Sequence, residues 1–144
     1  MRALLDVNVL IALLDVDHVH RRVATNWLSR NLHQGWASCP ITQNGCVRIM
    51  SQPAYPGGFS PKAVAARLAE AAAGSEHAFW PDDVNLLETG TLDWGRVFGH
   101  RQITDLYLLA LAVRQGGRFV TFNRRLDPAV VAGASSQHLV VLGG

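Results

Sequence analysis

The stretch that decides the fold is Thr104–Phe122, which reads TDLYLLALAVRQGGRFVTF. Its first part, Thr104–Gln115, is apolar nearly all round, and a helix without a polar face is usually buried. Gly116 and Gly117 end that helix. The next residues, Arg118–Phe122, form a short apolar run that predicts a strand. A buried helix followed directly by an apolar strand is typical of an α/β domain.

The rest of the chain repeats this alternation, which predicts a parallel sheet connected by helices. Four more strands are expected at Arg2–Leu5, Trp36–Cys39, His77–Trp80 and His138–Leu142. Two further helices are expected to begin at a capping residue: one runs from an Asp17 cap to about Leu32, and one from a Ser60 cap to about Ala73. Two more are expected over Thr42–Met50 and over the short run Leu86–Gly90. Asp127 and Pro128 have the pattern of one more helix start, and Gln52–Ser60 is rich in proline and glycine and predicts a loop.

Length and composition limit the possible classes of protein. The chain has 144 residues, which suits a single domain over residues 1–144. Hydrophobic residues make up 49% and charged residues 17%, which excludes intrinsic disorder. No apolar run approaches the roughly 20 residues of a membrane helix, and no basic leader precedes Asp6, so we expect a cytoplasmic protein without a membrane. Cys39 and Cys46 form no disulfide or metal motif, so two buried thiols are expected.

Polar side chains interrupt the apolar pattern where predicted strands end or helices begin. Asp6 follows the first strand, Asp105 begins the most hydrophobic helix, and Asn123 follows the fourth strand. In a parallel sheet these positions share one edge, which is where ligand sites occur. The same edge should carry Asn8, Thr121, Thr42 and Gln43.

The donors at this edge are all oxygen atoms, and such sets bind Mg²⁺ or Mn²⁺ rather than zinc. Taken singly, Asp6 and Asp105 could be only helix caps. Asp82, Asp83 and Glu88 follow the third strand and could approach the edge, or could form a solvated acidic loop. The chain has no glycine-rich nucleotide-binding motif.

Four segments, in this order, resemble the motifs of PIN-domain nucleases, and the VapC toxins of bacterial toxin–antitoxin pairs in particular. They are Asp6–Asn8, Pro40–Gly45, Ile103–Leu108 and Val120–Arg124. The resemblance covers essentially the whole chain. It implies a three-layer α/β/α fold and Mg²⁺- or Mn²⁺-dependent endoribonuclease activity on RNA. It also implies a VapB-type antitoxin that holds the toxin inactive, within a homodimer or a toxin–antitoxin hetero-oligomer.

The resemblance carries over residue by residue. Asp6 and Asp105 match two acidic residues of the family and are the expected metal ligands. Gln43 stands where many members have glutamate and Asn123 where many have aspartate, while Thr121 keeps the accompanying hydroxyl. Two amides in place of carboxylates remove two negative charges. One metal ion then remains plausible, and a tight two-metal site is harder to support.

Two other classes remain open at this point. The first is a catalytically weakened PIN-like module that binds RNA or protein, suggested by Gln43 and Asn123. The second is a phosphatase or receiver domain, but these use a lysine at a strand end, and the sole lysine, Lys62, begins a helix away from that edge.

Two surfaces are predicted to contact partners. Arginines flank the site motifs and could hold an RNA backbone, namely Arg48, Arg101, Arg124 and Arg125. The stretch 9–32 has more apolar residues than one helix face can bury, so some should line a groove for an antitoxin helix; the alternative is that all of them are core. From that groove, an antitoxin arginine could pair with Asp6 and Asp105.

Overall fold

A computed structural model describes residues 1–143, so only the last residue of the predicted 1–144 domain lies outside it. Its centre is a five-stranded sheet in the order β3-β2-β1-β4-β5, in which all neighbouring strands pair in parallel. The strands are β1 (Ala3–Leu5), β2 (Trp36–Ser38), β3 (His77–Phe79), β4 (Arg118–Thr121) and β5 (Leu139–Val141). All five lie within the segments predicted from sequence. The central position of β1 places its carboxyl end in the middle of the sheet edge.

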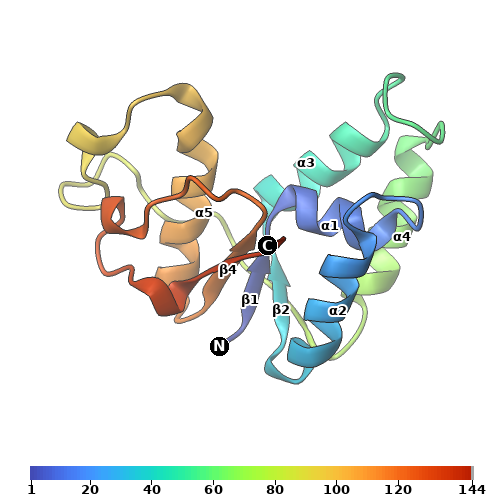
Figure 1. The fold of residues 1–144 in the computed structure, drawn as a ribbon, viewed down its shortest axis with the longest axis horizontal. Helices are drawn as coiled ribbons and strands as arrows, with labels where there is room; N and C mark the ends of the chain where they lie inside the picture. Colours follow the sequence, from blue (N-terminus) through green and yellow to red (C-terminus); the bar gives the residue numbers. More distant parts are fainter. Residues whose placement is uncertain (144) are drawn as a thin grey trace.

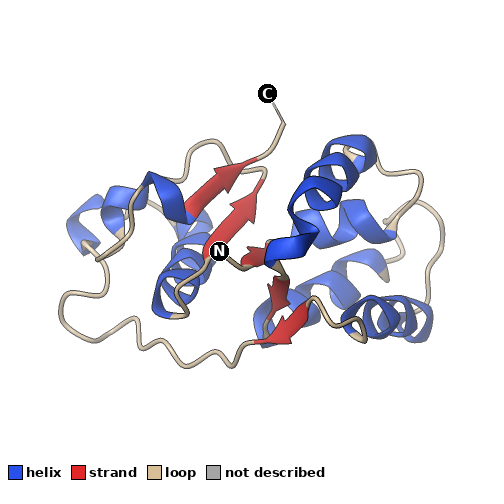
Figure 2. Ribbon diagram, turned by 90° about the horizontal axis from the view of Figure 1, so that it is seen from below, coloured by secondary structure: helices blue, strands red, loops and turns tan. Residues whose placement is uncertain are grey.

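Helices cover both faces of the sheet, as Figures 1 and 2 show, which confirms the three-layer α/β/α prediction. One face carries α1 (Val7–Leu14), α2 (Arg21–Asn31), α3 (Pro40–Met50) and α4 (Pro61–Ala72). The other face carries α5 (Ile103–Arg114) together with irregular segments that contain short 3₁₀ turns. Within residues 1–143, no helix has the length and apolar character that crossing a bilayer requires.

One predicted helix start and one predicted short helix are wrong, and local hydrogen bonds explain both. The helix expected from Asp17 begins only at Arg21, because the Asp17 N–H donates to Asp15 Oδ1 in a turn. The helix expected over Leu86–Gly90 is a series of turns, because the Leu87 N–H donates to Asn85 Oδ1. Aspartate and asparagine compete with helix formation in this way. The predicted Ser60 and Asp127 caps are confirmed, and α3 begins at Pro40, two residues before the predicted start.

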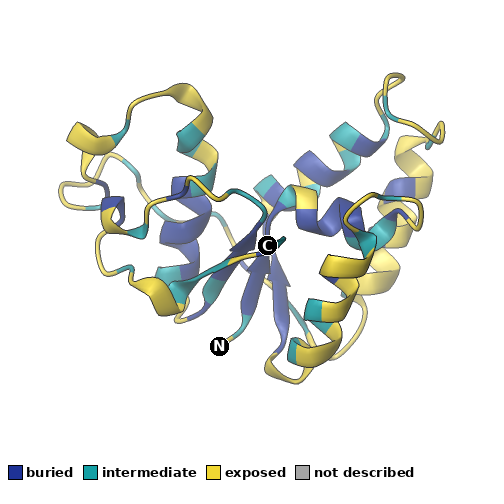
Figure 3. Ribbon diagram, in the orientation of Figure 1, coloured by how far each residue is buried: buried dark blue, intermediate teal, exposed yellow. Residues whose placement is uncertain are grey.

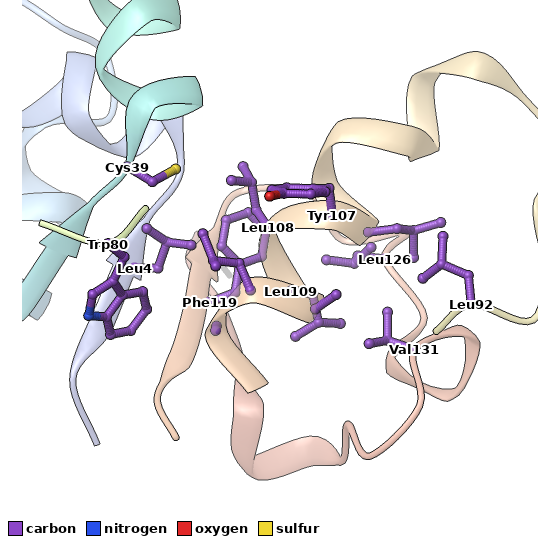
Figure 4. Packing of buried hydrophobic residues seen from close by; sticks show 14 of the residues in the cluster. Leu4, Cys39, Trp80, Leu92, Tyr107, Leu108, Leu109, Phe119, Leu126 and Val131 are labelled. Carbon is purple, nitrogen blue, oxygen red and sulfur yellow. The ribbon is translucent and has the colours of Figure 1, made fainter. Parts of the chain in front are cut away.

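The sheet separates two hydrophobic cores. Leu4 points into the core shared with α5, whereas Ala3 and Leu5 point into the core shared with α1–α4, as alternation along a strand requires. Figure 4 shows how Leu108, Leu109 and Phe119 fill the α5 side. Figure 3 shows buried strands surrounded by exposed loops.

The two cysteines are free and fully buried, as the sequence predicts. Cys39 lies in the α5 core and Cys46 in the opposite core. Burial raises the pKa of each thiol to about 11.

Candidate active site

Asp6 is held in the middle of the sheet edge by the backbone around it. Its N–H donates to the Val120 carbonyl at 2.9 Å, which continues the β1–β4 ladder. Its side chain begins α1, because Asp6 Oδ1 accepts from the Val7 N–H at 2.7 Å. The residue is only 7% exposed. Asp6 is therefore a helix cap, and it is also a buried carboxylate at the carboxyl end of the central strand.

Asp105 joins Asp6 through two residues of the β4 end. Thr121 Oγ1 donates to Asp6 Oδ2 at 2.7 Å, and the Asn123 N–H donates to Thr121 Oγ1 at 3.1 Å. The Asn123 side chain then donates to Asp105 Oδ2 at 2.7 Å. Asp105 lies in the first turn of α5, whose cap position is Gln102. We call these four residues the carboxylate network.

The carboxylate network carries negative charge that nearby cations do not neutralise. Burial, and then the charge of Asp105, raise the pKa of Asp6 to about 6, although hydrogen bonds from Thr121 and Val7 act in the opposite direction. Burial also raises the pKa of Asp105, against the hydrogen bond from Asn123. The salt bridges found within residues 1–143 involve other acids, Asp93 and Asp83. The site is thus electrostatically suited to a cation.

A cavity of about 520 Å³ opens beside Asp6. The starts of α1, α3 and α5 contribute to its walls through Val7, Asn44 and Thr104, and Arg48 lines it from farther along α3. At position 45, any side chain would collide with α1, because a Cβ there would lie 2.7 Å from Val7 Cγ2. Gly45 therefore lets α3 approach α1 closely at this cavity.

Asp82 also lines this cavity, which the sequence left undecided. Its Oδ2 accepts from the Ile41 N–H at 3.1 Å, while its Oδ1 is buried without a hydrogen-bond partner. Asp83 instead pairs with Arg114 on the protein surface. The signal that points to Asp82 is its position just after β3, which pairs with β2 along the same edge.

Three residues predicted for the edge do not line the cavity beside Asp6. The Gln43 side chain donates to Ser38 Oγ at 3.0 Å and does not line the cavity, and the hydroxyl of Thr42 bonds back to the Cys39 backbone. Asn8 is exposed on α1, also outside the cavity lining. The reason is rotation of about 100° per helical residue, which points Asn44 rather than Gln43 into the cavity.

The residues present fit one hard divalent cation. The donors are two carboxylates without a cationic partner, and Asp82 lines the adjoining cavity. Within residues 1–143 no group of three or more His, Cys, Asp or Glu side chains forms a metal cage. Mg²⁺ is commonly bound in this way, through one or two carboxylates with several retained waters.

Comparison with known proteins shows the family of this chain. A family model described as "PIN domain" matches residues 3–130. Ribonuclease VapC44 of Mycobacterium tuberculosis is 49% identical over 142 residues, covering 99% of this chain and 100% of the relative. Ribonuclease VapC39 of the same species is 46% identical over 134 residues, covering 92% and 96%.

A solved structure shows the same fold at low sequence identity. It is VapBC2 from Rickettsia felis bound to a DNA fragment from its promoter, with a TM-score of 0.66 and 15% identity. The match covers 99% of this chain and 100% of that chain. With a carboxylate pair at the sheet edge, a PIN-domain match over residues 3–130 and close relatives over almost its full length, this chain belongs to the PIN-domain family and is of the VapC type.

Proposed function

We propose that this protein is a Mg²⁺- or Mn²⁺-dependent endoribonuclease that acts as the toxin of a VapBC pair. The observation that carries the proposal is the pairing of Asp6 and Asp105 through Thr121 and Asn123: the charge of Asp105 raises the pKa of Asp6, burial raises both pKa values, and neither carboxylate has a cationic partner within residues 1–143. The names of the full-length relatives support ribonuclease activity. Metal dependence is our inference from the carboxylate network.

In this mechanism Asp6 and Asp105 hold the metal ion, which when bound would polarise the scissile phosphate and lower the pKa of a water. Thr121 fixes the orientation of Asp6 by its 2.7 Å hydrogen bond, and Asn123 does the same for Asp105. Arg48 lines the cavity beside Asp6 and is placed to bind an RNA phosphate. The chain thus contributes ligands, their orientation and one positive contact.

The test is cleavage of RNA by the purified protein. Activity should require Mg²⁺ or Mn²⁺, stop in EDTA, and be lost in Asp6→Asn and Asp105→Asn. Asp83→Asn is the matched control, because Asp83 is an aspartate on the surface that pairs with Arg114. Full activity in EDTA would refute the metal-dependent mechanism, and equal loss in the control would show that the effect is not specific to the site.

A second candidate is a PIN-like module that binds RNA or protein without cleaving it. The observation in its favour is the Asn123 amide, which already donates to Asp105 and supplies no negative charge. Such a module would bind RNA in EDTA and leave it intact with every divalent metal. The cleavage assay therefore separates the two candidates.

We also propose association with a VapB-type antitoxin. A mainly apolar cavity of about 320 Å³ is lined by Leu10, Leu13, Leu14 and Leu28, all from the stretch predicted to form a groove. Trp36 and Glu76 line it near the amino ends of β2 and β3, and Leu5 lines it at the carboxyl end of β1, next to Asp6. Leu10 lies one helical turn, about 6 Å, along α1 from Asp6, so an inhibitory arginine would have to reach past the start of α1.

Co-expression with the neighbouring small reading frame tests this association. Leu28→Glu should abolish co-purification, since it places a charge in the cavity. Leu87→Glu should not, because Leu87 is 84% exposed and lies outside the cavity. Thermal unfolding of both variants shows whether they are folded, and persistent binding by folded Leu28→Glu would refute this docking site.

A further inference from the structure

The segment that leads into α5 exposes aromatic rings beside positive charge. Phe98 is 84% exposed and Trp94 is 46% exposed. Between Trp94 and Arg101 the sequence WGRVFGHR has two arginines and one histidine; Arg96 pairs with the preceding Asp93 at 3.4 Å, which leaves His100 and Arg101 as the basic side chains of the segment outside that ion pair. In Figure 1 this yellow segment lies above α5, at the end of the molecule toward which the strands point.

The backbone of this segment is well anchored, so its rings are not exposed through loose structure. The Phe98 and Gly99 N–H groups both donate to Gln102 Oε1, at 2.6 and 3.1 Å. At the other end, the Asp93 N–H donates to the Val130 carbonyl at 2.8 Å. Val97 packs against the α5 core between these anchors. The backbone that carries Trp94 and Phe98 is therefore fixed, and both side chains are exposed on it.

The segment is continuous with the candidate site. Gly99 directly precedes the turn His100–Gln102 and then α5, which carries Thr104 on the cavity wall and Asp105 in the carboxylate network. One 3₁₀ turn and one α turn separate Phe98 from Asp105, a rise of about 10 Å. A nucleic-acid strand with a phosphate near Asp105 would bring a neighbouring base within reach of the Phe98 ring.

We propose that Phe98 and Trp94 form a stacking site for unpaired bases of the RNA substrate, and that His100 and Arg101 hold the adjoining phosphates. This inference rests on the proposed ribonuclease function and specifies its substrate as RNA with accessible, unstacked bases. Exposed rings interleaved with basic side chains are the usual means of binding such strands. Polar and basic neighbours interrupt the apolar surface, whereas a protein-docking patch is normally continuous.

Binding is measured by anisotropy with two fluorescein-labelled RNA 12-mers in EDTA, one of oligouridine and one with abasic riboses. Phe98→Ala should weaken oligouridine binding about tenfold, since one stacked base contributes about 1–3 kcal/mol. Binding of the abasic strand should change less than about twofold, because only phosphate contacts remain. Phe98→Tyr should restore binding, and Phe98→Leu should not. Leu87→Ala, also at a position that is 84% exposed, is the matched control.

Each contrary result has a distinct meaning. Wild-type binding by Phe98→Leu, or equal losses on both strands, would overturn the stacking site. The stacking site would also be overturned if Phe98→Ala caused a dimer or an antitoxin complex to dissociate while RNA binding stayed unchanged. If the wild type cleaves RNA and Phe98→Ala cleaves it with the same kcat/KM, the stacking site fails and the ribonuclease stands. If the wild type neither binds nor cleaves RNA, both proposals fail.

Discussion

Replacing Asn123 with aspartate tests the electrostatics of the carboxylate network with a change of almost no volume. The Asn123 amide donates to Asp105 Oδ2 at 2.7 Å, and an aspartate there has no N–H to give. The side-chain oxygen of Asn123, Oδ1, accepts from the Arg125 N–H at 3.0 Å, a bond that aspartate can keep. Asn123→Asp therefore replaces the hydrogen bond to Asp105 with a repulsion between two carboxylates, and it leaves the turn from Asn123 to Arg125 in place.

The size of the effect follows from the spacing of the charges. Two unit charges about 4 Å apart repel by about 4 kcal/mol at an effective dielectric constant of about 20. Protonation of one carboxylate limits the cost, so we expect a loss of about 2–4 kcal/mol at pH 7 without metal. For a chain of this size, that loss lowers the Tm by roughly 6–12 °C.

Divalent metal should reverse this loss. The added carboxylate supplies a third charged oxygen, so Mg²⁺ should bind the variant more tightly and raise its Tm more than that of the wild type. The assay is thermal unfolding in EDTA and in a Mg²⁺ series. Asn123→Ala is the control, since it removes the donor and adds no charge.

Two results would refute this reasoning. If Asn123→Asp unfolds at the wild-type temperature in EDTA, the hydrogen bond from the Asn123 amide does not stabilise the Asp105 carboxylate as described. If Mg²⁺ raises the Tm of both proteins equally, the carboxylate network is not the metal site.

Three further predictions concern neighbouring groups. In EDTA, the free energy of unfolding of the wild type relative to Asp6→Asn should fall by about 2 kcal/mol as pH rises from about 4 to about 7, as measured by urea unfolding. The reason is that the pKa of Asp6 rises from 3.8 to about 6 on folding, so the folded state binds this proton more tightly than the unfolded state does. The resulting stabilisation is lost as pH rises through about 6. A difference between the two proteins that does not change with pH would contradict the prediction. Thr121→Val should lower the free energy of unfolding, measured in urea, by about 2–3 kcal/mol, because it leaves Asp6 Oδ2 and the Asn123 N–H without their hydrogen bonds to Thr121. Thr121→Ser keeps the hydroxyl and should lower it less. Gln43→Glu should bind Mn²⁺ with an affinity within about twofold of the wild type in a calorimetric titration, because Gln43 bonds to Ser38 and does not line the cavity. A new charge directly at the metal would instead change the affinity about tenfold or more.

The sequence was sufficient for the features that depend on strand order and strand ends. Short apolar runs bounded by glycine, proline or aspartate located all five strands. Parallel pairing then brought Asp6, Thr121, Asn123 and Asp105 together across more than a hundred residues of sequence. This inference required only that parallel strands share an edge.

The features that were missed depend on rotation and on local competition. One step along α3 decides whether position 43 or 44 faces the cavity, and no apolar pattern marks that choice at a helix start. The turn at Asn85 displaced a predicted helix through a single side-chain hydrogen bond. Asp82 was left undecided because its surroundings come from α3, a segment about forty residues earlier in the chain.

The separation of Cys39 and Cys46 by the sheet has a practical consequence. A buried thiol with a pKa of about 11 reacts with alkylating reagents only when the surrounding structure opens, so its labelling rate measures that opening. The chain carries one such sulfur in each hydrophobic core. Equal rates at both sulfurs would mean that the two cores open in one cooperative event. Faster labelling of Cys46 would identify the α1–α4 layer as the part of the molecule that opens first.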